Sequence, residues 1–408
     1  MKKSLLALAV LGAFAGAAQA QSSVTIYGIV DTGIAYSSKT ISAVSGSTFP
    51  QTATTGSKFL MNSGVVQGSR IGFKGVEDLG GGLSAVFNLE TGFTNDNGGL
   101  QSDTGSTNLF RRKSVVGLSG GFGTVLLGRQ TDFLDDIGGS MTAVADFGGW
   151  VQNSGSNLSR LQGTRTNNSI RYNSPTVSGF TGSVIYGFGE QAGKTSAGQA
   201  FGAGLKYENG PLALAAGYYQ SKLGSTPSDV SLVNGGAGSG LTGAYVGNAG
   251  DTAVKTFTLA AQYQFGAAKV YGNWSRTKQP GAVAGGVFPN GTAQVAFTGT
   301  TPTNWILGGS NNDKTDTYEL GGSYSLSPSL KLLAAVDHSR INYVNAGAPK
   351  GKLTQYSLGA DYWLSKRTDL YAFVANIRTT DSINPGITGG SSGTDNQTAV
   401  AFGIRHKF

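Results

Sequence analysis

The chain has 408 residues, of which 65 are glycine, and only 13% of its residues are charged, against roughly 25% in typical soluble domains. It has no cysteine, which excludes disulfide-stapled folds and thiol catalysis, and its formal net charge is +8. Apolar content is also low, at 39%. Low charge with low hydrophobicity fits a wall one residue thick, apolar on one face and small or polar on the other, better than ordinary soluble domains.

The chain begins with a predicted secretory signal peptide. Lysines precede an apolar run from Leu5 to about Ala18, and a small-residue cleavage pattern ends at Ala20. The run is too short for a membrane-spanning helix, which needs about 20 apolar residues. We therefore expect residues 1–20 to be removed by cleavage after Ala20, which leaves residues 21–408 with a charge of 28 − 22 = +6.

Beyond the signal peptide, apolar and polar residues alternate with a period of two, which is typical of half-buried β-strands. Helical periodicity is absent from this part of the sequence. Runs at 255–265, 316–326 and 355–364 are each about ten residues long, the length at which a tilted strand crosses a bilayer. The first predicted strand is 22–36, where the lipid-facing residues are Val24, Ile26 and Val30 and the inward ones are Thr25 and Asp31.

The last predicted strand runs to the end of the chain. Its apolar face carries Val400, Phe402, Ile404 and Phe408, and its other face carries Arg405 and Lys407. We expect the apolar face to contact lipid and the basic residues to face water, because a charge at the lipid midplane costs about 2–4 kcal/mol.

The connections between strands predict the topology. Short Gly-, Pro-, Ser- or Asn-rich turns alternate with long polar segments, and eight long plus seven short connections give fifteen, hence sixteen strands. An unpaired backbone group in lipid costs several kcal/mol, so the last strand must pair with the first and close a barrel. The short turns are 78–82, 119–123, 173–179, 208–211, 266–268, 327–329 and 365–367, and the long segments are about 40–66, 95–108, 131–166, 190–198, 223–251, 279–314, 342–351 and 382–395. The predicted fold is thus an all-β, sixteen-stranded antiparallel up-and-down barrel.

The sequence resembles Gram-negative general diffusion porins of the sixteen-stranded, trimeric kind, nearest the betaproteobacterial branch. The resemblance covers the whole mature chain and rests on "SSVTIYGIVDTGI" after the signal, "SRIGFKGVEDLGGGLSAVF" (69–87), "RRKSVVGLSGGFGTVLLGRQ" (111–130), "NSIRYNSP" (168–175) and the terminal Phe408. It implies an integral protein of the cell outer membrane, a homotrimer, and contact with outer-membrane lipid and lipopolysaccharide. It also implies that the barrel insertion machinery reads Phe408.

The resemblance implies that the third long segment, 131–166, folds inward and narrows the channel. Its "ADFGG" (145–149) resembles the Pro-Glu-Phe-Gly-Gly element of relatives, which makes Asp146 the constriction acid. Enteric relatives have a second acid four residues earlier, where this chain has Thr142. Other acids in this segment are candidates to compensate, and the full acidic set is Asp132, Asp135, Asp136 and Asp146.

On the opposite wall the resemblance implies a ladder of basic residues. It falls on Arg70, Arg112 and Arg171, and the alternation around residues 70 and 171 independently favours an inward direction for Arg70, Lys74 and Arg171. At 111–118 valines occupy both alternate sets, so either Arg112 or the pair Arg111 and Lys113 points inward.

The expected function is passive diffusion of ions and small hydrophilic solutes through a water-filled channel with weak anion preference. The alternatives are a substrate-specific channel for organic anions and a barrel adhesin. The sequence shows no catalytic constellation. Asp337 and Ser339 flank His338, but neighbours on a strand point to opposite faces. We expect no enzymatic activity, cofactor, metal or nucleic-acid partner.

Overall fold

The computed structural model describes most of the chain outside the long connections. The described residues are 23–41, 55–101, 108–152, 165–190, 192–193, 195–196, 198–222, 253–278, 312–343, 350–380, 386–387 and 395–408. The predicted signal peptide and its cleavage point at Ala20 lie outside them.

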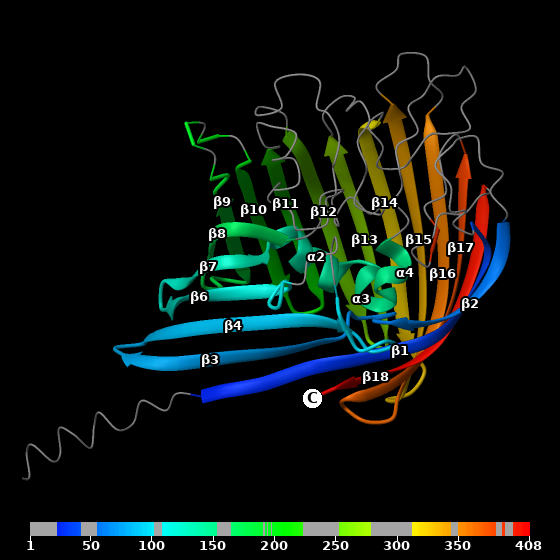
Figure 1. Ribbon diagram of the computed structural model, residues 1–408, viewed down its shortest axis with the longest axis horizontal. Helices are drawn as coiled ribbons and strands as arrows, with labels where there is room; N and C mark the ends of the chain where they lie inside the picture. The colour runs from blue at the N-terminus through cyan, green and yellow to red at the C-terminus, as the bar shows by residue number, and fades with distance from the viewer. Residues whose placement is uncertain are drawn as a thin grey trace, which may run out of the picture.

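Antiparallel strands form one sheet that closes on itself where β1 pairs with β18 (Figure 1). The strands of the first half are β1 (Ser23–Ile41), β2 (Thr55–Ser63), β3 (Arg70–Gly80), β4 (Leu83–Thr94), β5 (Gly99–Leu100), β6 (Lys113–Gly120), β7 (Gly123–Thr131), β8 (Arg165–Asn173) and β9 (Phe180–Gly187). Those of the second half are β10 (Ala200–Asn209), β11 (Leu212–Lys222), β12 (Ala253–Phe265), β13 (Ala268–Lys278), β14 (Asn312–Ser325), β15 (Leu330–Tyr343), β16 (Gly351–Trp363), β17 (Thr368–Thr380) and β18 (Asn396–Lys407).

The eighteen strands correspond to the sixteen membrane-crossing strands that the sequence predicts. The strands β2 and β3 pair one after the other along β1, with Ser63 opposite Thr32 and Arg70 opposite Ile29. Together they form one membrane-crossing strand that is interrupted between them. The two-residue β5 pairs with the end of β4 and does not cross the membrane. Counting β2 and β3 as one strand and leaving out β5 gives 18 − 2 = 16. The predicted long connection at about 40–66 is wrong in its second half, because residues 55–63 are strand β2.

The two faces of the sheet differ as the alternation predicts. Val24 and Phe402 are 66% and 58% exposed on the outside of the barrel, whereas Asp31 is buried on the inside. The terminal residue closes the ring, because the Phe408 N–H donates to the Gly28 carbonyl and the Gly28 N–H donates back, each at 3.1 Å. Arg405 points inward, where its Nε donates to Asp369 Oδ1 at 3.0 Å.

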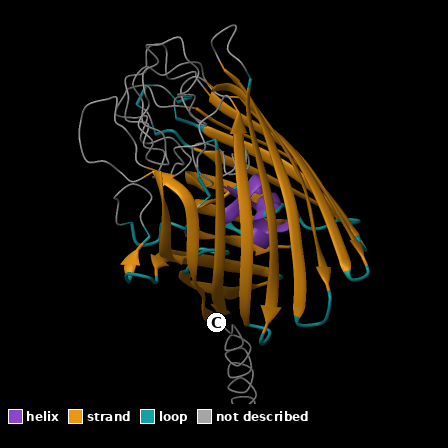
Figure 2. Cartoon of the chain, turned by 90° about the vertical axis from the view of Figure 1, so that its right-hand side faces the viewer, coloured by secondary structure: helices purple, strands orange, loops and turns teal. Residues whose placement is uncertain are grey.

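The segment 131–152 contains three short helices, α2 (Phe133–Met141), α3 (Val144–Phe147) and α4 (Gly149–Gln152), which lie inside the ring of strands (Figure 2). The expectation of an inward-folded third loop is confirmed, whereas the absence of helical pattern is wrong for this segment. The Asp132 side chain accepts from the Leu134 N–H at 2.8 Å and caps α2, whose first apolar pair packs against the barrel wall. None of the helices in the described part of the chain is long and apolar enough to cross a membrane.

The helix α2 docks on β10 and β11 through glycines that leave room for its side chains. A Cβ at Gly204 would lie 1.8 Å from Phe133 Cδ1, and one at Gly217 would lie 2.6 Å from Leu134 Cδ2. These two contacts press the apolar face of α2 directly against the backbone of the wall. The start of the inward loop is thereby fixed on one side of the barrel.

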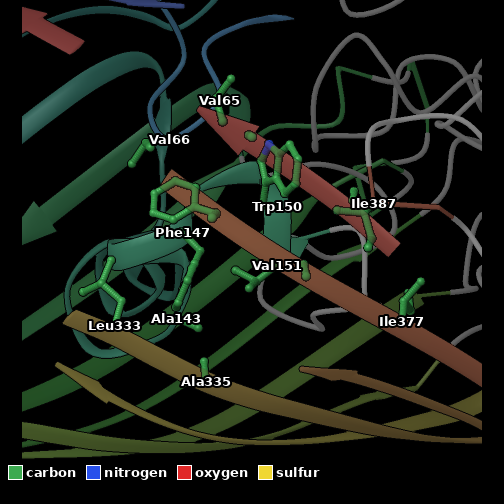
Figure 3. Packing of buried hydrophobic residues seen from close by; sticks show 14 of the residues in the cluster. Val65, Val66, Ala143, Phe147, Trp150, Val151, Leu333, Ala335, Ile377 and Ile387 are labelled. Carbon is green, nitrogen blue, oxygen red and sulfur yellow. The ribbon is translucent and has the colours of Figure 1, made fainter. Parts of the chain in front are cut away.

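The helices α3 and α4 dock elsewhere on the wall (Figure 3). Phe147 is fully buried and meets Phe373 edge-on, with ring centroids 5.3 Å apart. The stretch 64–69 between β2 and β3 completes this cluster, since Val65 and Val66 pack beside Trp150 and Phe147. The interruption between β2 and β3 thus provides the surface on which the inward loop packs.

We expect Gly148→Ala to weaken this docking. Gly148 has φ +58° and ψ −135°, a conformation that non-glycine residues adopt at a cost of about 1–3 kcal/mol, and its Cβ would lie 1.9 Å from the Val66 carbonyl oxygen. Limited proteolysis of the folded barrel should cleave the variant faster within 131–166. The matched control is Gly138→Ala, whose Cβ would meet nothing within 4 Å. Equal cleavage of the two variants would contradict the packing described for Gly148.

Candidate pore constriction

A pair of arginines on the inner wall shares one carboxylate. Arg112 Nε lies 2.6 Å from Glu90 Oε1, and Arg70 Nε lies 3.9 Å from Glu90 Oε2. The Tyr27 hydroxyl contacts the same carboxylate, at 3.0 Å from Oε2, which leaves Glu90 well supplied with donors. Two guanidinium groups facing one carboxylate leave a net charge of 2 − 1 = +1 at this point of the wall.

The arrangement also places the residues that the sequence left open. Lys113 pairs with Glu90 across β6 and β4, so its side chain starts on the inner face, and Arg112, just before the strand, turns its guanidinium to the same glutamate. The Arg111 carbonyl accepts from Arg129 Nε. Thus Arg112 and Lys113 share the neighbourhood of Glu90, and the Arg111 side chain is buried. Lys74 is exposed on the inner wall, with its Nζ 5.4 Å from the centre of the Tyr27 ring.

Arg171 is buried and holds the start of the inward loop. Its Nε lies 2.9 Å from Asn173 Oδ1, its Nη1 donates to the Thr131 carbonyl at 2.9 Å, and its Nη2 pairs with Asp136. Thr131 and Asp136 flank the start of α2, so the guanidinium ties the helix to β8. Replacing Arg171 would therefore release the loop as well as remove a charge.

The four acids predicted at the constriction have three different environments. Asp135 lies within electrostatic range of Arg70, and Asp136, on the same turn of α2, is 46% exposed and pairs with Arg171. Asp132 caps α2 and is buried. Asp146 is only 8% exposed, because it lies at the junction of α3 with the wall, where Lys269 Nζ is 3.6 Å away. In this geometry Asp135 and Asp136, rather than Asp146, are the loop carboxylates next to the basic wall.

A second acidic group lies where the loop meets the wall, and sequence reasoning missed it. Glu319 and Asp337 are directly opposite each other on β14 and β15, both buried, and Glu319 Oε1 accepts from the Ala143 N–H at 2.8 Å. His338 points outward instead and bonds to Thr354, so it forms no catalytic group with Asp337. The alternation in "DTYEL" marked Glu319 as inward, but nothing in the sequence showed that it would meet the loop.

Glu90 was also missed, although a local signal existed. In β4, Asn88 and Glu90 share the inner face, while Leu89 lies on the other. What the sequence could not supply was the distance, because Tyr27, Arg70 and Arg112 come from three separate segments.

These charged side chains lie on the inner side of the barrel wall and at the start of the inward loop. Arg70 and Arg112 pair with Glu90, which Lys113 faces across β6 and β4, and Arg171 pairs with Asp136. Fixed charges in a narrow space between low-dielectric walls focus the field across it. Such a passage orients water and polar solutes and favours the ion of opposite sign.

Comparison with known proteins gives consistent matches. The sequence profile of a family described as "Gram-negative porin" matches residues 7–382. Outer membrane porin protein 32 of Delftia acidovorans is 33% identical over the full length of both chains. An outer membrane porin protein of Bordetella pertussis is 40% identical over 235 residues, a match that spans 54% of this chain and 60% of that one.

A solved structure is similar over nearly the whole chain. It is that of an anion-selective porin from Comamonas acidovorans, and it has a TM-score of 0.67 and 29% sequence identity. The similarity covers 95% of this chain and 100% of that one.

Proposed function

The chain belongs to the Gram-negative porin family, and from this premise we propose that it is an outer-membrane channel for passive diffusion of ions and small hydrophilic solutes, with a weak preference for anions. A sixteen-strand barrel is too wide to be filled by its own side chains, so it leaves an aqueous lumen that the inward loop narrows. The protein is integral to the outer membrane, as its relatives are. Passage through it needs no chemical step and no cofactor.

The observation that carries the anion preference is the sharing of Glu90 by Arg70 and Arg112. One carboxylate neutralises one guanidinium, so the wall keeps a positive charge where the loop approaches it. Lys74 and Lys113 add to it. The similar porin from Comamonas acidovorans is described as anion-selective, which agrees with this sign.

The preference should depend strongly on salt. The screening length falls from about 10 Å at 0.1 M to about 3 Å at 1 M, so fixed charges act over less of the lumen at high salt. We expect the anion-to-cation permeability ratio to move toward one as KCl is raised over this range. A ratio that is constant with salt would argue against electrostatic selection by the wall.

Single-channel conductance tests the function and separates it from the substrate-specific alternative. A general diffusion channel should show large, linear currents in a planar bilayer, with no block by millimolar organic anions such as citrate or phthalate. A channel specific for organic anions would be blocked at much lower concentration. The cluster of Arg70, Arg112 and Tyr27 is the feature that favours this second candidate, because it offers several donors to a carboxylate.

We also propose that the barrel works as a homotrimer, as the porin resemblance implies. Native mass spectrometry of the detergent-purified protein should show three copies, and a stable monomer would contradict this.

The function of Phe408 as an insertion signal is a further proposal, and Phe408→Ala should lower the yield of folded barrel in the outer membrane. N-terminal sequencing of mature protein would test cleavage after Ala20.

A further inference from the structure

The interruption between β2 and β3 contains more residues than the strand beside it. The strand β2 ends opposite Thr32 of β1 and β3 begins opposite Ile29, so residues 64–69 lie opposite only Val30 and Asp31. Compared with a continuous ladder, the chain has 6 − 2 = 4 extra residues at this point. The extra residues leave the ladder, so their backbone N–H and C=O groups need other partners. We call residues 64–69 the inserted segment.

Both ends of the inserted segment are bonded to the backbone of one residue, Asp31. At the first end, the Gly64 N–H donates to the Asp31 carbonyl oxygen at 2.7 Å. At the other end, the Ser69 hydroxyl donates to the same carbonyl and accepts from the Asp31 N–H, both at 3.0 Å. The segment is therefore closed into a loop whose two ends meet at Asp31.

The side chain of Asp31 holds the middle of the inserted segment. Its Oδ2 accepts from the Val66 N–H at 3.0 Å and from the Gln67 N–H at 2.7 Å. Its Oδ1 accepts from the Tyr371 hydroxyl at 2.6 Å. Asp31 is completely buried, so removing its carboxylate would leave the two amide donors without this acceptor, and a buried donor without a partner is costly. One aspartate thus fixes both ends and the middle of the segment.

Two routes connect Asp31 with the inward loop. The first runs through the inserted segment, because Gly148 lies so close to Val66 that a Cβ at Gly148 would be 1.9 Å from the Val66 carbonyl oxygen. The second runs through Tyr371, which stacks on Phe373 with ring centroids 5.1 Å apart. Phe373 in turn meets Phe147 of the loop edge-on. The bonds of Asp31 therefore bear on the surface against which α3 and α4 pack.

The inserted segment also contacts the basic wall. A Cβ at Gly68 would lie 3.1 Å from Arg112 Nη1, so the Arg112 guanidinium lies against the backbone of the segment. The same guanidinium is bonded to Glu90 through its Nε, at 2.6 Å. The segment thus contacts the inward loop through Val66 and the arginine that shares Glu90 through Gly68.

We propose that Asp31 is a positioning residue of the constriction, which sets the place of both the inward loop and Arg112 by holding the inserted segment. It acts as an acceptor of hydrogen bonds and not as a fixed charge of the pore, because it is completely buried and its carboxylate is bonded to two backbone amides and a hydroxyl. Its effect on current rests on the proposed channel function, whereas its effect on the packing of the segment does not.

The test uses the absence of cysteine from the chain. Val65 of the inserted segment is only 3% exposed, so Val65→Cys introduces a single buried thiol, and its rate of labelling by a small water-soluble thiol reagent is measured on the folded barrel. This background is combined with Asp31→Ala, Asp31→Asn and Ser69→Ala. The matched control is Asp369→Ala, which removes an equally buried aspartate from β17, where it pairs with Arg405. Heat-modifiable gel mobility checks folding, and single-channel conductance is recorded for each variant.

We expect Asp31→Ala to raise the labelling rate about tenfold, equivalent to about 1.4 kcal/mol, and to increase the conductance. Asp31→Asn should stay close to the Val65→Cys background, because an amide oxygen still accepts both N–H groups and the amide N–H can donate to the Tyr371 oxygen. Ser69→Ala should also raise the rate, since it frees one end of the segment, and Asp369→Ala should leave it unchanged.

Three results would each overturn the proposal: background labelling in Asp31→Ala, labelling of Asp31→Asn as fast as that of Asp31→Ala, or equally fast labelling in Asp369→Ala. If Asp31→Ala does not fold, background labelling in Ser69→Ala would overturn it instead. Labelling requires no ion flow, so a barrel that shows these differences but stays insulating would contradict the channel function and leave the role of Asp31 intact.

Discussion

Simultaneous replacement of Arg70 and Arg112 by serine is expected to abolish the weak anion preference of the channel. Both guanidinium groups face Glu90, so their loss changes the charge at this point from 2 − 1 = +1 to −1. A unit charge about 4 Å from an ion changes its energy by about 1 kcal/mol even in water. We therefore expect the anion-to-cation permeability ratio to fall by roughly tenfold at low salt.

The reversal potential across a KCl gradient in a planar bilayer measures this change directly. Glu90→Gln is the opposing control, because it leaves both arginines uncompensated and should strengthen the anion preference. Arg171 is unsuitable for this purpose, since it also holds the loop through Thr131 and Asp136. An unchanged reversal potential in the double variant would place the selectivity elsewhere in the lumen.

Phe147→Ala is expected to release the inward loop from the wall without unfolding the barrel. Phe147 is fully buried against Phe373, and removing a buried phenylalanine ring costs about 3–5 kcal/mol. That cost falls on the docking of α3 and α4, while the hydrogen-bonded ring of strands keeps its own stability. Single-channel records should show larger and noisier conductance, and the segment 131–166 should become sensitive to protease.

The control for this variant is Phe402→Ala, which removes the same ring from the lipid-facing surface, where Phe402 is exposed. It should leave conductance and loop protection close to wild type. Conductance and protection that stay at wild-type values in Phe147→Ala would show that the loop is held without this contact.

The barrel itself could be predicted from sequence because its rule is local. Period-two alternation can be recognised from neighbouring residues alone, and the number of sixteen membrane-crossing strands follows from counting the short and long connections. The predicted directions of Val24, Asp31 and Arg405 are confirmed for the same reason. A strand's side chains can point to only two faces, and an apolar residue identifies one of them.

Packing inside the lumen could not be predicted in this way. The helix α2 spans only nine residues, and its cap Asp132 is one of the acids that the sequence predicts at the constriction. The interruption at 64–69 has no strong sequence signal of its own, because its packing partner Phe147 lies far along the chain.

The charges illustrate the same limit. Motif similarity pointed to Asp146, but whether a carboxylate faces water or a lysine on the wall depends on how the loop settles, and here it meets Lys269. Conversely, Glu90 was visible as an inward residue of β4, yet its meaning depends on Arg70 and Arg112 arriving from other segments. Long-range electrostatic pairs are set by tertiary structure, which alternation along one strand does not encode.

The most direct test of the channel and its positive wall is the zero-current potential of the wild-type protein in a planar bilayer under a tenfold KCl gradient at low salt. We predict open, ion-conducting channels whose potential has the sign of chloride preference. A potential of the opposite sign, or a membrane that stays insulating after insertion of folded protein, would contradict an anion-preferring pore.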